Sequence, residues 1–431
     1  MAQPNGHTPL PILIAGGGCT GLFLAHLLTH SNDPTTTTTT PPLPNPILVL
    51  EPNPPSRDST RAMAHQPLVF PLFARAGLMP RLAAAGSFSS GLCFRGSARG
   101  GSKMIAGRTF DVAKGEKAQL LLPQWRFQEV LLGEVQGSRG GGGGGTVRMG
   151  WRVVDFAQED ACVRVQIQNV DTGETQEVEA AYLIGADGAH STVRKRLGLG
   201  FEGETLDAQL VATDLRFDFH AHGFYDANFV IDREDYGLVG RIDNEGLWRV
   251  SYGVPAGTSE EEIRAGVHEK LARMLPGEGL DGQGNRAYEV VRIAPYKAQQ
   301  RCVDAFWKGR VGVVGDAAHL TNPYAGLGLA SGLADASSLA PILSHILSPS
   351  SPTAKDPAKL LDSWSTARRN LFHAVVDRPS RAAYARVRSK ADTNEDVQAL
   401  LSRDPLVGAL KKGMPMMPPS LETKVEELEG W

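Results

Sequence analysis

Two runs of apolar residues, LPILIA at 10–15 and ILVL at 47–50, each end at a glycine-rich or acidic stretch. Short continuous apolar runs are typical of strands that are buried on both faces of a parallel sheet. Between the two runs, residues 22–28 show the apolar spacing of a helix. The pattern therefore predicts a strand, a helix and a second parallel strand that ends at Glu51.

Two low-complexity stretches interrupt this pattern. The stretch near 31–46 is rich in threonine and proline, and the stretch near 137–146 is rich in glycine. Such compositions neither continue a helix nor pack a core. We interpret both as exposed insertions, the first of them between the first helix and the second strand.

The rest of the chain changes its periodicity several times. Alternating apolar and polar positions predict strands, and spacings of three and four predict helices. We expect a β-meander over 147–184 and an antiparallel sheet over 208–253, which a helix over 259–274 follows. A strand is expected within 310–319, then a loop and a helix, and finally one long helix over about 358–390.

Composition narrows the class of protein. The 431 residues include 44 basic and 47 acidic side chains, which gives a net charge of −3 and no reason to expect binding to nucleic acid. No run of apolar residues reaches the ~18 that a membrane helix needs. The four cysteines have neither metal-site nor disulfide spacing, and the first residues lack a signal sequence, so we expect a cytoplasmic protein.

The first strand and helix are joined by the sequence GGGCTG, which fits the pattern GxGxxG. In such a turn Gly16 permits the tight bend, Gly18 lets the backbone approach a pyrophosphate, and Gly21 lets the helix pack closely on the strand. Glu51 ends the next strand, where a ribose-binding carboxylate belongs, and the Thr/Pro insertion explains the long spacing. A carboxylate here favours FAD or NAD over NADP, and the motif alone leaves FAD and NAD both open.

Two later stretches end an apolar strand with glycine and aspartate. They are YLIGADGAHSTVRKRLGL at 182–199, with Asp187 and Gly188, and GRVGVVGDAAH at 309–319, with Gly315 and Asp316. The small residues allow a ligand to approach the backbone, and each carboxylate can accept hydrogen bonds from hydroxyl groups. A turn capped by an aspartate is the alternative for either stretch taken alone.

With these three motifs in this order, residues 10–345 resemble the single-component FAD-dependent aromatic monooxygenases of the 4-hydroxybenzoate hydroxylase type. The resemblance implies an α/β fold. Its parts are a Rossmann-like FAD-binding domain, an inserted antiparallel β-sheet substrate domain and a C-terminal helical region. The predicted boundaries are 1–200 and 291–347 for the FAD-binding domain, 201–290 for the substrate domain and 348–431 for the helical region.

The resemblance also implies cofactor contacts. Asp316 would bind the ribityl chain of FAD, and Asp187 would serve both FAD and the nicotinamide nucleotide. Pro323, Gly326 and Gly328 would line the flavin ring, although AGLGLA at 325–330 departs from the GGQGLN of many members. Arg61 and Arg126 match flavin-facing arginines, with a surface cation as the alternative for each.

The implied reaction is hydroxylation of a phenolic or other electron-rich aromatic compound by dioxygen and NADPH or NADH, through a C4a-hydroperoxyflavin. Water must be excluded, and a base or cation near the substrate hydroxyl favours the reactive phenolate. Candidates on the inserted sheet are Tyr225, Tyr236, Arg241 and Tyr252, each of which could equally belong to the core or the rim.

No metal site is expected. His220 and His222 are two positions apart on a predicted strand, but no third ligand accompanies them, so a solvated or hydrogen-bonded pair is the favoured interpretation. We expect His319, directly after the Gly-Asp motif, to be structural.

Several alternatives stay open on the same scaffold. An epoxidase or a Baeyer-Villiger monooxygenase would share the cofactor motifs, and a catalytically inactive nucleotide-binding protein would share the fold. A flavin-dependent halogenase is disfavoured because the WxWxIP stretch is missing. The low-complexity insertions favour a fungal enzyme of secondary metabolism. The sequence leaves the substrate, the choice between NADPH and NADH, and the oligomeric state undetermined.

Overall fold

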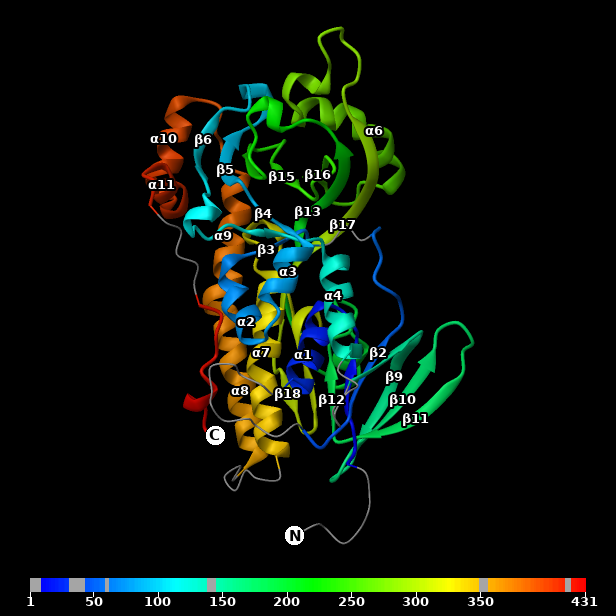
Figure 1. Ribbon diagram of the computed structural model, residues 1–431. Coiled ribbons are helices and arrows are strands. Elements are labelled where there is room, and N and C mark those ends of the chain that lie inside the picture. Colours follow the sequence, from blue (N-terminus) through cyan, green and yellow to red (C-terminus); the bar gives the residue numbers. More distant parts are fainter. Residues whose placement is uncertain (1–8, 31–42, 59–61, 138–144, 349–355, 415–419) are drawn as a thin grey trace.

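A computed structural model describes residues 9–30, 43–58, 62–137, 145–348, 356–414 and 420–431. Its lower half contains a six-stranded sheet in the order β18-β19-β12-β1-β2-β8 (Figure 1). All neighbouring strands are parallel except β18, which runs antiparallel to β19. The strands are β1 (Ile12–Ala15), β2 (Ile47–Glu51), β8 (Thr146–Met149), β12 (Tyr182–Gly185), β18 (Trp307–Lys308) and β19 (Val311–Val313).

The predicted order of strand, helix and strand is confirmed at the N-terminus. Helix α1 (Cys19–Thr29) begins directly after the glycines, three residues earlier than predicted, because the turn itself needs only Gly16 to Gly18. The neighbouring helices are α4 (Gln124–Gly137) and α7 (Gly328–Leu347), both in contact with α1. The two insertions fall between α1 and β2 and between α4 and β8, and most of their residues lie outside the described part.

The predicted meander is also confirmed. Strands β9 (Trp151–Gln158), β10 (Val163–Asn169) and β11 (Thr175–Ala180) form an antiparallel sheet at the edge of the lower half, and β12 then returns to the parallel sheet (Figure 1). Smaller elements complete this half: β3 (Ala64–His65), β4 (Ser87–Phe88), β7 (Leu120–Leu121), α2 (Phe70–Arg75), α3 (Met79–Ala85) and α5 (Thr192–Arg196).

The upper half contains an eight-stranded sheet in the order β20-β17-β13-β16-β15-β14-β5-β6, which is antiparallel except between β14 and β5. The predicted sheet over 208–253 is confirmed, and the sheet also takes strands from before and after it. The strands are β5 (Gly91–Gly96), β6 (Met104–Thr109), β13 (Phe201–Arg216), β14 (Ala227–Ile231), β15 (Gly237–Arg241), β16 (Leu247–Pro255), β17 (Glu289–Val303) and β20 (His319–Leu320). The domain boundaries at 200, 290 and 347 stay predictions.

The two faces of this sheet differ in what covers them. Helix α6 (Glu260–Met274), predicted over 259–274, packs on one face against Val211, Val250 and Tyr252. The opposite face carries Leu210 and its cross-strand neighbour Tyr296. This second face packs against the turn η7 (Pro323–Ala325), which joins the two halves of the molecule.

The long C-terminal helix is confirmed over the predicted range, with one irregular turn. Helix α8 (Pro357–Leu371) continues through a π-helical segment, η8 (Phe372–Asp377), into α9 (Arg378–Val387) (Figure 1). The irregular turn ends two residues before Pro379, whose missing N–H cannot bond the preceding turn. Helices α10 (Asn394–Arg403) and α11 (Pro405–Lys411) then cover β5 and β6. No helix in the described ranges is long and apolar enough to cross a membrane.

Candidate functional site

At two positions of the glycine turn after β1, neighbouring backbone atoms leave no room for a side chain. Gly16 has φ of +105°, and a Cβ atom there would lie 2.3 Å from the carbonyl oxygen of Ala186 in the loop after β12. A Cβ atom on Gly21 would lie 2.0 Å from the carbonyl oxygen of Gly16. Both positions therefore require glycine for the packing of the chain itself.

Gly18 is different because it faces open space. No atom of the described chain lies within 4 Å of the place where its Cβ would be. Gly18 is also the N-cap of α1, and no side chain caps the helix there. Uncapped N–H groups at the positive end of a helix bind anions, so this space suits the pyrophosphate of a dinucleotide.

Glu51 lies at the end of β2, directly beside the glycine turn. Its Oε2 accepts a hydrogen bond from the N–H of Gly17 at 2.7 Å, and its Oε1 accepts one from the N–H of Asn53 at 2.9 Å. These bonds fix the carboxylate where a ribose would bind. Gln128 of α4, which no sequence motif marks, also reaches this turn, because its Nε2 donates to the carbonyl of Gly17 at 3.4 Å.

The Asp187 motif forms the loop after β12. Asp187 accepts hydrogen bonds from the hydroxyl of Ser191, the N-cap of helix α5, and, at 2.7 Å, from the N–H of Thr192, the first residue of that helix. Burial raises the pKa of Asp187, and these hydrogen bonds oppose that rise. Arg194 donates to the carbonyl of Ala317 at 3.0 Å, which ties this motif to the third one.

The third motif lies beside the first. Gly315 has φ of +61°, and a Cβ atom there would lie 2.7 Å from the hydroxyl of Thr20. Asp316 follows in the 3₁₀ turn η6 (Gly315–Ala317) and is exposed. Strands β1, β12 and β19 are parallel neighbours, so their carboxyl ends bring all three loops to one edge of the sheet.

A buried charge network holds the third loop. Asp335 of α7 accepts from the N–H of Gly315 at 2.9 Å, from Nε2 of His319 at 2.8 Å and from Nε of Arg368 at 2.8 Å. These nearby donors hold the pKa of Asp335 below its usual value, although the carboxyl is fully buried. His319 is therefore structural, as predicted.

The turn predicted to face the flavin follows this loop. Asn322 caps it by accepting from the N–H of Tyr324, and Gly326 has φ of +63° beside Gln66. Pro323 is half-buried, and Gly328 begins α7. The hydroxyl of Tyr324 is buried and has no hydrogen-bond partner in the described chain. Burial raises the pKa of Tyr324 well above its ordinary value, so the hydroxyl keeps its proton.

Of the two arginines predicted to face the flavin, the structure describes only Arg126. Arg61 lies outside the described residues. Arg126 is in the first turn of α4, where it pairs with Glu129 at 2.9 Å and leaves 47% of its side chain exposed.

Among the four predicted catalytic residues, Tyr236 lies beside the turn η7. Its ring centroid is 6.1 Å from those of Tyr324 and Tyr384. Tyr252 is 1% exposed on the opposite sheet face, under α6, where its hydroxyl contacts that of Thr213. Its position does not support a substrate contact.

Tyr225 and Arg241 are both engaged within the inserted sheet. A Cβ atom on Gly91 or Gly107 would come within 3.1 Å of the Tyr225 ring, so this ring covers β5 and β6. The guanidinium of Arg241 binds the carboxylate of Asp226 through two hydrogen bonds, of 2.6 and 3.1 Å.

The predicted strand placement of His220 and His222 is wrong. They lie in a short 3₁₀ helix, η4 (His220–His222). His220 bonds Asp226 at 3.0 Å, and His222 stacks on Phe217.

A further buried ion pair, outside the predicted site residues, lies on the inner face of the upper sheet, which is the face that carries Leu210 and Tyr296. Arg249 of β16 binds Asp214 of β13 through hydrogen bonds of 2.7 and 3.0 Å, and Arg292 of β17 binds the same carboxylate at 3.0 Å. Arg292 also reaches Asp58 in the loop after β2. Charged residues inside the apolar strands LVATDLRF and LWRVSYGV were the available signal.

Comparisons with known proteins agree with this geometry. The profile described as "FAD binding domain" matches residues 9–379. Para-nitrophenol 4-monooxygenase from Pseudomonas sp. (strain WBC-3) is 34% identical over 84% of this chain and 83% of its own length. The 6-hydroxy-3-succinoylpyridine 3-monooxygenase HspB from Pseudomonas putida is 31% identical, over 85% and 86%.

Solved structures give the same result. The crystal structure of p-nitrophenol 4-monooxygenase PnpA from Pseudomonas putida DLL-E4 matches with a TM-score of 0.80 and 29% identity, over 94% of this chain and 96% of that one. The flavin-dependent monooxygenase PieE in complex with FAD and substrate matches in fold, with a TM-score of 0.72 and 22% identity over 94% of this chain and 70% of that one.

The chain belongs to the FAD binding domain family. This membership confirms the predicted fold class, the cofactor FAD and the reaction class, which is that of a flavin-dependent monooxygenase of aromatic compounds. The two relatives named above come from bacteria and do not support the predicted fungal origin.

Proposed function

We propose that this enzyme hydroxylates a small phenol-type compound, with one aromatic ring and an ionisable hydroxyl, using dioxygen and NADPH or NADH in the cytoplasm. The names of the two relatives support a single hydroxylated ring as substrate, in one case a phenol and in the other a hydroxypyridine. The observation that carries the proposal is the buried Arg249–Asp214–Arg292 group on the inner sheet face.

The Arg249–Asp214–Arg292 group carries one more positive charge than negative charge. Two guanidinium groups share one carboxylate at the sheet, and the side chains of Arg249 and Asp214 are 7% and 1% exposed. A second carboxylate, that of Asp58, meets Arg292 only at the surface. A net positive charge in a poorly hydrated region stabilises an anion, so it favours the phenolate form of a bound phenol.

Two tyrosines can orient the substrate. Tyr296 lies close enough to Arg249 for the guanidinium to lower its pKa, but burial outweighs this effect and raises the pKa to about 12. Tyr296 and Tyr324 therefore both keep their protons at neutral pH, and both can donate a hydrogen bond to a ring oxygen. Leu210 and Leu238 pack beside them and exclude water.

When bound, FAD would supply the activation of dioxygen. The protein binds and orients the substrate and excludes water from the site. We propose that the cofactor is held at the edge where the three loops meet and that its ring lies against the turn after Asn322. The proposed contacts are Gly16, Gly18, Gly21, Glu51, Arg61, Arg126, Asp187, Gly188, Gly315, Asp316, Pro323, Gly326 and Gly328.

The test compares three arginine substitutions in steady-state assays with para-nitrophenol and other simple phenols. Arg249→Met removes the positive charge, and we expect KM for the phenolate to rise ~10- to 100-fold, which corresponds to ~1.5–3 kcal/mol for a lost charged hydrogen bond. Arg249→Lys keeps the charge and should recover most of the affinity. Arg386→Met is the matched control, because Arg386 of α9 forms a similarly buried pair with Asp404, the N-cap of α11, and lies over the ring of Phe94 on β5.

Arg241→Met tests the sequence-based prediction in the same assay. A larger rise in KM for Arg241→Met than for Arg249→Met would assign the cation to the Arg241–Asp226 pair instead. Equal, small effects of both substitutions, with bound FAD retained, would overturn the proposal of a phenolate held by a buried arginine.

A further inference from the structure

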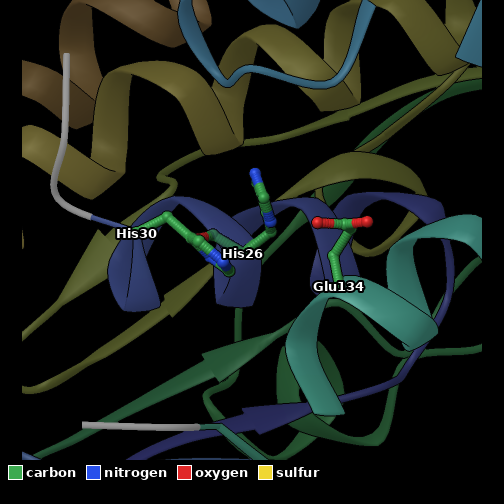
Figure 2. Close-up of side chains that lie close together, drawn as sticks. All are labelled: His26, His30 and Glu134. Carbon is green, nitrogen blue, oxygen red and sulfur yellow. The ribbon is translucent and has the colours of Figure 1, made fainter. Parts of the chain in front are cut away.

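Three side chains gather on the far end of α1, away from the glycine turn. His26 and His30 come from α1, and Glu134 comes from the neighbouring helix α4 (Figure 2). Each offers a nitrogen or oxygen atom that can bind a metal ion, and these atoms all lie within 4.8 Å of one another. Among the described residues they form the one such group of three.

The hydrogen bonding of His26 prepares one ring nitrogen as a ligand. Nε2 lies 2.9 Å from the carbonyl oxygen of Ala76, and because a carbonyl only accepts, Nε2 carries the proton. Nδ1 then keeps its lone pair. Nδ1 is buried and has no hydrogen-bond partner in the described structure, and the whole residue is only 2% exposed.

His30 follows the same pattern one turn later. Its Nδ1 lies 3.0 Å from the carbonyl oxygen of His26, so Nδ1 carries the proton and Nε2 has the lone pair. The two rings are 4.2 Å apart between centroids. A metal-binding histidine usually donates its other ring N–H to a carbonyl or carboxylate, which fixes the tautomer, and both histidines have this arrangement.

Glu134 supplies a carboxylate with 16% of its side chain exposed. It forms an ion pair with Arg81 of α3, whose side chain is 64% exposed. A carboxylate has two oxygens, so it can keep the arginine on one and present the other to a cation. The C-terminal end of α1 also carries the negative end of the helix dipole, which favours a cation there.

We propose that His26, His30 and Glu134 form a binding site for a divalent transition-metal ion of the zinc class. Two imidazole nitrogens and one carboxylate oxygen suit zinc, with water in the fourth position. Ligands ~2.1 Å from a zinc ion lie ~3.4 Å apart, so His30, at the end of α1, must rotate inward on binding. The site is independent of the reaction proposed above.

Metal binding here would link two helices that both contact the glycine turn. Helix α1 begins at that turn, and α4 reaches it through the bond of Gln128 to Gly17. A ligand that binds only the folded protein raises its stability. Zinc bound at the far end of α1 would therefore hold α1 and α4 together, and it should raise the melting temperature.

The experiment uses the tag-free full-length holoprotein after treatment with a chelator. Zinc chloride is titrated calorimetrically, and cobalt is added in parallel because its absorption spectrum reports nitrogen and oxygen ligation. We expect one equivalent to bind and the melting temperature to rise. His30→Ala and Glu134→Gln should each weaken binding at least ~10-fold, the smallest loss typical of damage to a metal site.

Two further variants separate this site from general histidine binding. Arg81→Ala removes the competing cation from Glu134, so zinc affinity should not fall. His222→Ala removes an exposed histidine of the other histidine pair, in η4, and should leave the titration unchanged. Zinc binding that survives both His30→Ala and Glu134→Gln, or the lack of any one-equivalent binding to the parent protein, would overturn the proposal. FAD content and NADPH oxidation, measured on the same samples, report on the proposed function separately.

Discussion

Gly18 and Gly21 are three positions apart in the same turn, yet an added methyl group should affect protein stability at only one of them. A Cβ atom on Gly21 would lie 2.0 Å from the carbonyl oxygen of Gly16, whereas one on Gly18 would meet no chain atom within 4 Å. Gly21→Ala should therefore destabilise the folded protein, whereas Gly18→Ala should weaken only the binding of a ligand at the N-terminal end of α1.

The size of each effect follows from these distances. A carbon and a carbonyl oxygen pack no closer than ~3.3 Å, so Gly21→Ala must move α1 from β1 by more than ~1 Å. Overpacking of this kind costs ~3 kcal/mol, since the opposing atom is backbone and cannot rotate away. Gly18→Ala costs the empty protein about 1 kcal/mol at most, through the weaker N-cap. It should nevertheless weaken FAD binding ~10-fold or more, because the methyl group occupies the approach to the pyrophosphate.

The assay measures urea unfolding of the FAD-free protein and FAD affinity by fluorescence quenching for both variants. We expect Gly18→Ala to keep the unfolding midpoint and lose FAD affinity, and Gly21→Ala to lose both. Normal FAD affinity in Gly18→Ala would refute the placement of the pyrophosphate at the start of α1. A Gly21→Ala protein as stable as the parent would refute the packing argument.

Three more predictions concern buried groups. Tyr324→Phe removes a buried hydroxyl without a partner in the described chain, so unfolding free energy should change by less than ~0.5 kcal/mol, while kcat/KM falls ~5- to 10-fold if the hydroxyl bonds the ligand; unchanged kcat/KM would exclude that bond. Asp335→Asn leaves the guanidinium of Arg368 without its buried counter-charge, so urea unfolding of the holoprotein should show a loss of ~3–5 kcal/mol; a loss under ~1 kcal/mol would contradict the network. Burial lowers the pKa values of His26 and His65 from 6.5 to about 4, so the unfolded chain binds more protons between these pH values. The unfolding free energy should therefore fall as pH drops from 6.5 towards 4, by roughly 3 kcal/mol per histidine, and His65→Leu should remove about half of that slope; an unchanged slope would show that His65 titrates normally.

Local patterns predicted the parts of the fold that local chemistry determines. The apolar run at 10–15, the glycines after it and Glu51 define one strand, turn, helix and strand unit, and the structure has that unit. The alternating segments over 208–253 likewise form the expected antiparallel strands. In both regions hydrophobic periodicity and turn residues point to the same structure.

Pairings between distant segments could not be predicted in the same way. Strands β5 and β6 join the upper sheet next to β14, more than a hundred residues later, and nothing in their composition names that partner. The carboxylate of Asp335 accepts hydrogen bonds from Arg368 and from the N–H of Gly315. The carboxylate of Asp214 likewise binds two arginines, Arg249 and Arg292. These groups are far apart in the sequence and meet only after folding. Tyr252 was selected for its chemistry, but which sheet face a residue occupies depends on strand register.

The most direct test of the proposed activity is a turnover experiment with isotopically labelled dioxygen. Purified protein, NADPH or NADH and a simple phenol such as para-nitrophenol are incubated together, and the product is analysed by mass spectrometry while peroxide is measured. We predict one labelled oxygen atom in the aromatic product, with little peroxide released. Bound FAD with NADPH oxidation that yields only peroxide for every phenol tried would contradict the proposed phenol substrate.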